Sequence, residues 1–286
     1  MRILMNNHFA MGINEYTGQF KKVRGTGMIK IYDSNIEDLF VSGVIDITNT
    51  RINKSKLVGE VCAKKVEFEN VEIIGNFAGM GICKAKIMHV AGNLNVEILD
   101  TVIICDSKHM KKEANNNIKW SGIIKAVTFE SYNDFTIKSN YIFKNIINVN
   151  KLLSGDRIFC DNLFSFDIIK TECINADNVY ITAIKGSDIR QIEGGKVVIG
   201  KELIQNESIR DIPKTIDISK IKKMKSNEKI EVYFIEADEV DVDYLKAIKI
   251  CGKTVSIGDN CIVDTVEYSK ELILGKNAIV KKVTRL

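Results

Sequence analysis

Apolar and polar residues alternate along most of the chain, as in Ile29-Lys30-Ile31 and in Val44-Ile45-Asp46-Ile47. A two-residue period sends successive side chains to opposite faces of a strand, whereas a helix would show a period of about 3.6 residues. The alternating runs are short, and turn-forming residues separate them. The pattern therefore predicts an all-β chain built from many short strands.

Glycine marks an equivalent point in successive units, and each glycine lies sixteen or seventeen residues from the next one in its run. These repeat glycines are Gly27, Gly43, Gly59, Gly75 and Gly92 near the N-terminus and Gly258 and Gly275 near the C-terminus. Glycine suits positions where the backbone takes a positive φ or approaches another strand closely. We expect the repeat glycines to lie at corners of a coiled chain.

Units of this length are too short to enclose a core alone, so successive units must stack and pair their equivalent strands. The expected fold is a parallel β-helix, or solenoid, with coils of about 16–17 residues. The chain contains one proline, Pro213. Its scarcity agrees with a nearly continuous ladder, in which almost every backbone N–H is needed.

Two polar stretches interrupt the repeat and are expected to be insertions that leave the coils. The first is rich in lysine, and the second contains Pro213. The expected organisation is an N-terminal tail or cap at 1–22, a first solenoid segment at 23–105, an insertion at 106–120, a second, irregular solenoid segment at 121–200, an insertion at 201–229 and a C-terminal solenoid segment at 230–286.

Composition and charge exclude several classes of protein. With 45% hydrophobic and 27% charged residues, the chain is too apolar for an intrinsically disordered protein. Its 41 basic and 37 acidic residues give a formal net charge of +4, which provides no footprint for nucleic acid. The first eighteen residues lack the apolar core of a signal peptide, and no run approaches a membrane span. We therefore expect a cytoplasmic protein.

The glycine-punctuated run 23–59 and the C-terminal run 257–280 resemble the bactofilin family of polymer-forming cytoskeletal proteins. The resemblance implies a right-handed β-helix and self-assembly without nucleotide, as a homo-oligomer or filament. It also implies a cytoplasmic location, with the membrane surface or envelope proteins as further partners. The long chain, its second insertion and its degraded middle repeats depart from the family pattern.

The sequence presents no catalytic, cofactor-binding or metal-binding constellation. Seven cysteines contain no C-x-x-C pair, and we expect them to be reduced apolar core residues. The histidines, His8, His89 and His109, are scattered. Glu239, Asp241 and Asp243 share one face of a predicted strand, which we interpret as a solvated face, with calcium binding or catalysis as the alternative.

Two groups of residues are candidates for contact with a membrane or a partner: Ile3, Leu4 and Phe9 near the N-terminus, and Lys220, Lys222, Lys223 and Lys225 in the second insertion. The alternatives are a cap over the first coil for the apolar group and a solvated loop for the lysines.

The favoured function is a non-enzymatic structural or scaffolding protein that self-associates through its β-solenoid. Two alternatives remain at this point. One is a β-helix acyltransferase or carbohydrate-active enzyme, which would need a cleft where His89 or the acids at 238–243 meet basic residues. The other is a monomeric binding module with capped ends.

Overall fold

The computed structural model describes residues 8–106, 119–149, 151–200 and 229–286. Throughout these ranges the regular elements are strands, and every strand pairing given by the structure is parallel. The expected all-β parallel solenoid is therefore confirmed. In the same ranges there is no helix long and apolar enough to span a membrane.

The chain forms two compact units, one comprising Met1–Glu130 with Asn140–Ile142 and the other comprising Ser131–Ser139 with Phe143–Leu286. The strands begin and end as follows: β1 His8–Thr48, β2 Arg51–Lys64, β3 Glu67–Asp106, β4 Trp120–Ser131, β5 Phe135–Thr136, β6 Tyr141–Asn148, β7 Leu153–Ser165, β8 Ile169–Thr182, β9 Asp188–Gly200, β10 Ile230–Val242, β11 Leu245–Ile257, β12 Ile262–Leu274 and β13 Ile279–Arg285.

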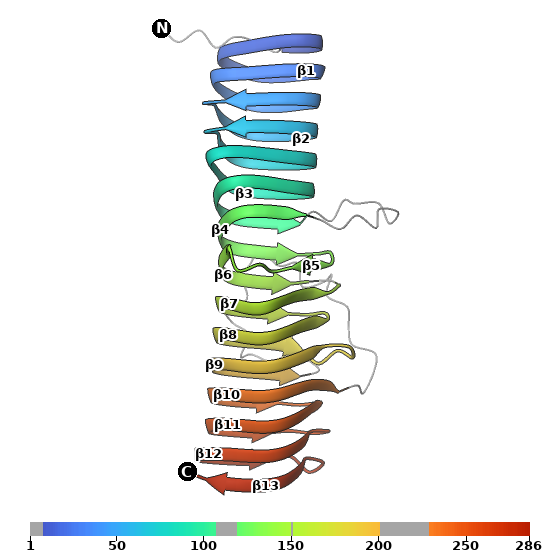
Figure 1. Ribbon diagram of the computed structural model, residues 1–286, viewed down its shortest axis with the longest axis vertical. Helices are drawn as coiled ribbons and strands as arrows, with labels where there is room; N and C mark the ends of the chain where they lie inside the picture. Colours follow the sequence, from blue (N-terminus) through green and yellow to red (C-terminus); the bar gives the residue numbers. More distant parts are fainter. Residues whose placement is uncertain (1–7, 107–118, 150, 201–228) are drawn as a thin grey trace. The chain divides into compact units, whose positions relative to one another are not determined.

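In the first unit, neighbouring coils pair with a sixteen-residue offset, from Asn35 with Arg51 in β1 and β2 to Arg51 with Glu67 in β2 and β3. β1 and β3 each continue through several coils (Figure 1). Residues 8–22 of the expected tail or cap belong to β1. In this first coil the ring of His8 packs edge-on against Tyr16 and Phe20, at centroid distances of 6.0 and 5.4 Å.

In the second unit, one apolar column runs through successive coils in register. Its members are Ile158, Ile174, Ile192, Ile235, Ile250 and Val266, all with no exposed surface, followed by Val283 in β13, which is 45% exposed. Each fully buried aliphatic side chain contributes roughly 1.5–3 kcal/mol through removal of apolar surface from water. The stacked columns are therefore the core.

Most of both expected insertions, residues 107–118 and 201–228, lies outside the described residues. β9 nevertheless pairs directly with β10, Ile199 with Val242, although residues 201–229 separate them in the sequence. The other segment boundaries proposed from the sequence stay a prediction.

The repeat glycines of the first unit occupy one corner of each coil. Gly27, Gly43, Gly59 and Gly75 have φ values of 121°, 116°, 120° and 126°, and Gly92 has 146°. A Cβ atom built on Gly59 would lie 2.2 Å from the carbonyl oxygen of Gly43, one coil away. Only glycine satisfies both the positive φ and this close approach of backbones.

The C-terminal repeat glycines differ from those of the first unit in backbone conformation and in what lies against them. Gly258 and Gly275 directly follow β11 and β12 and take no positive φ. Their amides donate to the carbonyl groups of Val242 and Ile257, each at 2.7 Å. A Cβ on Gly258 would overlap the carboxylate of Asp243, so this glycine makes room for a neighbouring side chain.

A second corner recurs with the same period and was missed in the sequence. Asp33, Asn49 and Lys65 have φ values of 49°, 50° and 53°, and Gly81 follows with 68°. Asp and Asn tolerate this left-handed conformation better than most residues. The Asn49 side-chain amide donates to the carboxylate of Asp33 in the preceding coil at 2.5 Å.

We predict that Gly59→Ala destabilises the fold more than Gly18→Ala, by about 1–3 kcal/mol in free energy of unfolding. Gly18 also has a positive φ, of 114°, but has open space where a Cβ would lie. The pair therefore separates backbone strain from collision with the next coil. Urea denaturation of both variants measures the difference, and equal losses would contradict the close-contact explanation.

Candidate functional site

The described histidines do not form a site with one another, and only His89 was a candidate for the alternative catalytic role. His8 packs against Tyr16 and Phe20 in the first coil. His89 is exposed on β3. His109 lies outside the described residues. Both described histidines belong to the first unit, whereas the acidic run at 238–243 belongs to the second.

The acidic run faces solvent, as the interpretation of a solvated face predicts. Glu239 and Asp241 are exposed on β10, and Asp243 directly after it is half-buried. Asp238 pairs with Lys253 at 2.8 Å, and Glu239 lies 3.9 Å from Lys196. Both pairs join neighbouring coils, so these acids help to hold the stack together.

Asp241 also marks the end of a buried apolar cluster outside the coil interior. The cluster contains Ile147, Val149, Phe164, Phe166, Tyr180 and Val198, with Phe164 and Tyr180 stacked at 5.1 Å. Asp241 pairs with Val198 across β10 and β9 and therefore takes the next position in one of its columns. The change from valine to aspartate shows where this outer face becomes polar.

No group of three or more histidine, cysteine or acidic side chains comes together in metal-binding fashion within the described residues. Asp243 is the most buried acid of the run. Its carboxylate is held within the chain, because it accepts a hydrogen bond from the backbone N–H of Asp259. Burial raises the pKa of Asp243, and the charges of Asp241 and Asp259 raise it further, while that hydrogen bond opposes the shift.

No disulfide joins the seven cysteines, all of which lie within the described residues, and six of the seven are buried or half-buried. Burial raises the pKa of the Cys160 thiol to about 12 and that of Cys261 to about 11. A thiol of such high pKa contains almost no thiolate at neutral pH and is a poor nucleophile. Only Cys62 is exposed.

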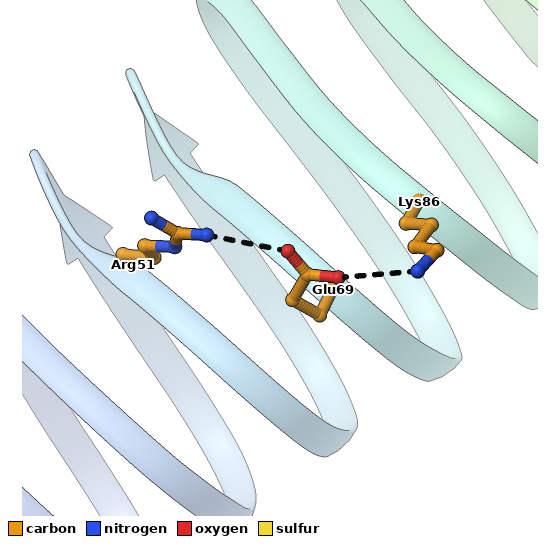
Figure 2. Close-up of polar contacts among 3 residues, drawn as sticks. All are labelled: Arg51, Glu69 and Lys86. Atoms are coloured by element: carbon orange, nitrogen blue, oxygen red, sulfur yellow. Dashed lines mark hydrogen bonds and ion pairs between the residues drawn. The ribbon is translucent and has the colours of Figure 1, made fainter.

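A polar groove of about 750 Å³ follows the second corner across four coils. Its lining includes Asn35, Asn49, Arg51, Lys65 and Glu67. Arg51 at its edge pairs with Glu69 at 3.3 Å, and Glu69 reaches Lys86 at 3.9 Å, so one carboxylate joins three coils (Figure 2). The groove supplies donors and acceptors, but its lining has no histidine or cysteine to act as base or nucleophile.

The glycine corner of the first unit carries exposed apolar side chains on its first three coils. Gly12 lies against Gly27 at this corner, and each of the six side chains lies three residues before, one residue before or one residue after Gly12, Gly27 or Gly43. We call this set the apolar corner: Phe9, Met11, Ile13, Met28, Phe40 and Val44, with exposed fractions of 75, 72, 74, 42, 43 and 50%.

Further along the same corner, the column that contains Val44 becomes polar and paired. Val44 is followed in its column by Glu60, Asn76 and Asn93. The Asn76 amide donates to Glu60 at 2.6 Å, and the Asn93 amide donates to Asn76 at 2.9 Å. In the column that contains Ile13, Met28 and Val44, the first three coils therefore lack the polar ladder that the following coils have.

Phe9 is the one residue of the proposed membrane or partner contact that the structure describes, and it belongs to the apolar corner. Ile3, Leu4 and the lysines at 220, 222, 223 and 225 lie outside the described residues. The residue after each repeat glycine can be read from the sequence, and its polarity changes from coil to coil. A comparison of Ile13 and Val44 with Glu60 would have indicated the corner.

We predict that one thiol per chain reacts rapidly with an aromatic disulfide reagent at pH 8, and that Cys62→Ser removes this fast phase. The raised pKa values of Cys160 and Cys261 keep those thiols protonated, so their slow reaction should accelerate as the pH approaches 11. Fast reaction of two or more thiols in the native protein would contradict the burial described above.

We also predict that Asp243→Asn stabilises the protein at neutral pH. Because the pKa of Asp243 is higher in the folded state, the folded protein holds this proton more tightly than the unfolded chain does. The wild-type carboxyl therefore contributes to stability at low pH, and this contribution is lost as the pH rises through the folded-state pKa. The variant should therefore gain free energy of unfolding relative to wild type between about pH 4 and 7, measured by urea denaturation. A difference that does not change with pH would refute this account.

No protein-family model matches the chain, and no curated protein or solved structure matches it. The bactofilin resemblance therefore stays a prediction of the repeat pattern.

Proposed function

We propose that this chain is a non-enzymatic scaffold of the bactofilin type that associates with copies of itself through the lateral surface of its β-solenoid. The apolar corner carries the proposal. Contiguous exposed apolar surface on a monomer commonly marks an interaction site. The polar ladder at Glu60, Asn76 and Asn93 supports this interpretation. It shows that later coils form the same corner with polar side chains in this column, so the fold does not require apolar ones there.

The described residues also favour a structural role over catalysis. The eleven ion pairs that the structure gives each join different coils, as Lys56 with Glu72 at 2.9 Å and Lys281 with Asp264 at 2.7 Å do. The charged groups in these pairs join neighbouring coils and stabilise the stack. A cytoplasmic location stays a prediction of the resemblance. Contact with a membrane surface or with envelope proteins does so too.

We predict that Ile13→Lys combined with Val44→Lys weakens self-association by at least about tenfold, because it places two charges in apolar contact surface. The fold should tolerate Val44→Lys, since the new ammonium group would lie beside Glu60 of the next coil. Sedimentation velocity over a range of protein concentrations measures the change, with circular dichroism to verify the fold.

The matched control combines Phe159→Lys with Ile248→Lys, which adds the same charge at side chains 57% and 52% exposed in the other unit. The control should associate like wild type. A monomeric wild-type protein at every concentration and salt level would sink the proposal, as would equal losses in both double variants.

A further inference from the structure

The polar groove at the second corner has a shape that suits an extended chain. It has a volume of about 750 Å³ and takes its lining from four successive coils. A smaller hollow of about 330 Å³ adjoins it, because Asn35 and Arg51 line both, and Gln19 extends this hollow to the first coil. Together the two hollows follow the stacking direction over five coils.

One column along this groove differs from other polar columns of the first unit, because its side chains do not satisfy one another. Its members in successive coils are Gln19, Asn35, Arg51, Glu67 and Lys84. Elsewhere Asn49 bonds to Asp33, and Asn76 bonds to Glu60. Arg51 pairs with Glu69, but the other four members form no side-chain hydrogen bond or ion pair within the described residues. Their polar groups are therefore open to a ligand.

The groove carries opposite charges at its two ends. Asp33 and Glu37 lie in the second coil, whereas Lys65 and Lys84 lie in the fourth and fifth coils. Glu67 also lies near the basic end, so two lysines without an ion pair in the described part of the chain stand beside one acid. A ligand with a cation at one end and an anion at the other would meet complementary charge at both ends.

The amide side chains between these ends favour a peptide as the ligand. Gln19, Asn35 and Asn53 line the smaller hollow, and each amide carries both a donor and an acceptor, as every backbone peptide unit does. Five coils about 4.8 Å apart span about 19 Å, which about six residues of an extended chain cover at about 3.3 Å each. A neutral glycan would offer hydroxyl groups but no pair of opposite charges for the two ends.

We propose that this groove binds an extended peptide segment of about six residues from a partner protein. A basic residue of the peptide lies toward Asp33 and Glu37, and an acidic residue lies toward Lys65 and Lys84. This binding goes beyond self-association and does not depend on it, because the groove shares no residue with the apolar corner. The groove is open and its anchors are polar, so we expect a Kd on the order of tens of micromolar.

Fluorescence anisotropy of the full chain with labelled, end-capped hexapeptides tests the proposal. The probes are Lys-Thr-Thr-Thr-Thr-Glu and its reversed sequence, which together cover both directions of the bound chain. One of them should bind at least about tenfold more tightly than Gln-Thr-Thr-Thr-Thr-Gln, which keeps the backbone but lacks both charges. Binding of neither charged peptide, or equal binding of the neutral one, would overturn the proposal.

The double variant Lys65→Glu with Lys84→Glu should weaken binding of the preferred peptide at least about tenfold, because it reverses the charge of the basic end. The matched control is Lys125→Glu with Lys170→Glu, which changes two exposed lysines outside the groove by the same charge. The control should bind like wild type, and circular dichroism verifies the fold of both. Equal losses in both double variants, or displacement of the peptide by dextran, would contradict a peptide site in this groove.

Sedimentation velocity separates this proposal from self-association. The groove variant should associate like wild type while losing the peptide. A wild-type chain that binds the peptide but stays monomeric would overturn the proposed function alone, and a chain that associates but binds neither charged peptide would overturn the groove proposal alone.

Discussion

The fold of the first unit depends on how closely one coil can approach the next at the glycine corner. Parallel strands lie about 4.8 Å apart, and at this corner the carbonyl oxygen of one coil occupies the space that a Cβ of the next would need. Gly43 lies against Gly27, and Gly59 lies against Gly43. Each glycine is therefore required by its neighbour, and one larger side chain would affect the stacking on both sides.

The coils are held together outside the core by pairing of like positions. Asparagine donates to asparagine at 145, 162 and 178, and acids meet bases one coil away, as Lys56 meets Glu72 and Lys253 meets Asp238. Individual exposed pairs contribute little stability. Their effect is to set the register, since a shift of one residue would separate every pair. The apolar corner differs from these positions, because its exposed apolar side chains form no polar pairs with the neighbouring coils.

The fold was largely predictable from the sequence because alternation and glycine spacing report directly on coil geometry. Gly27, Gly43, Gly59 and Gly75 were identified by period alone and share one conformation. Gly258 and Gly275 fitted the same spacing but lie at a different kind of turn. The corner at Asp33, Asn49 and Lys65 was not identified because three chemically different residues occupy it. A backbone conformation can repeat where residue type does not.

The candidate site was less predictable than the fold. Phe9 was selected for its apolar character near the N-terminus, but its partners Ile13, Phe40 and Val44 become neighbours only when the coils are stacked. In the sequence these residues belong to alternating runs, and only a comparison of equivalent positions in successive coils, such as Val44 with Glu60, separates them from ordinary outward positions. Exposure, which depends on what the adjacent coil carries, distinguishes them.

The direct pairing of β9 with β10 has a consequence for how such a chain can change in length. Gly200 and Ile230 belong to adjacent coils, so the residues between them start and finish at nearly the same place. Closing a longer loop between fixed ends adds only about 0.6 kcal/mol for each doubling of its length. A change in the length of the segment at this junction therefore costs little in closure entropy, and the pairing of β9 with β10 can keep its register.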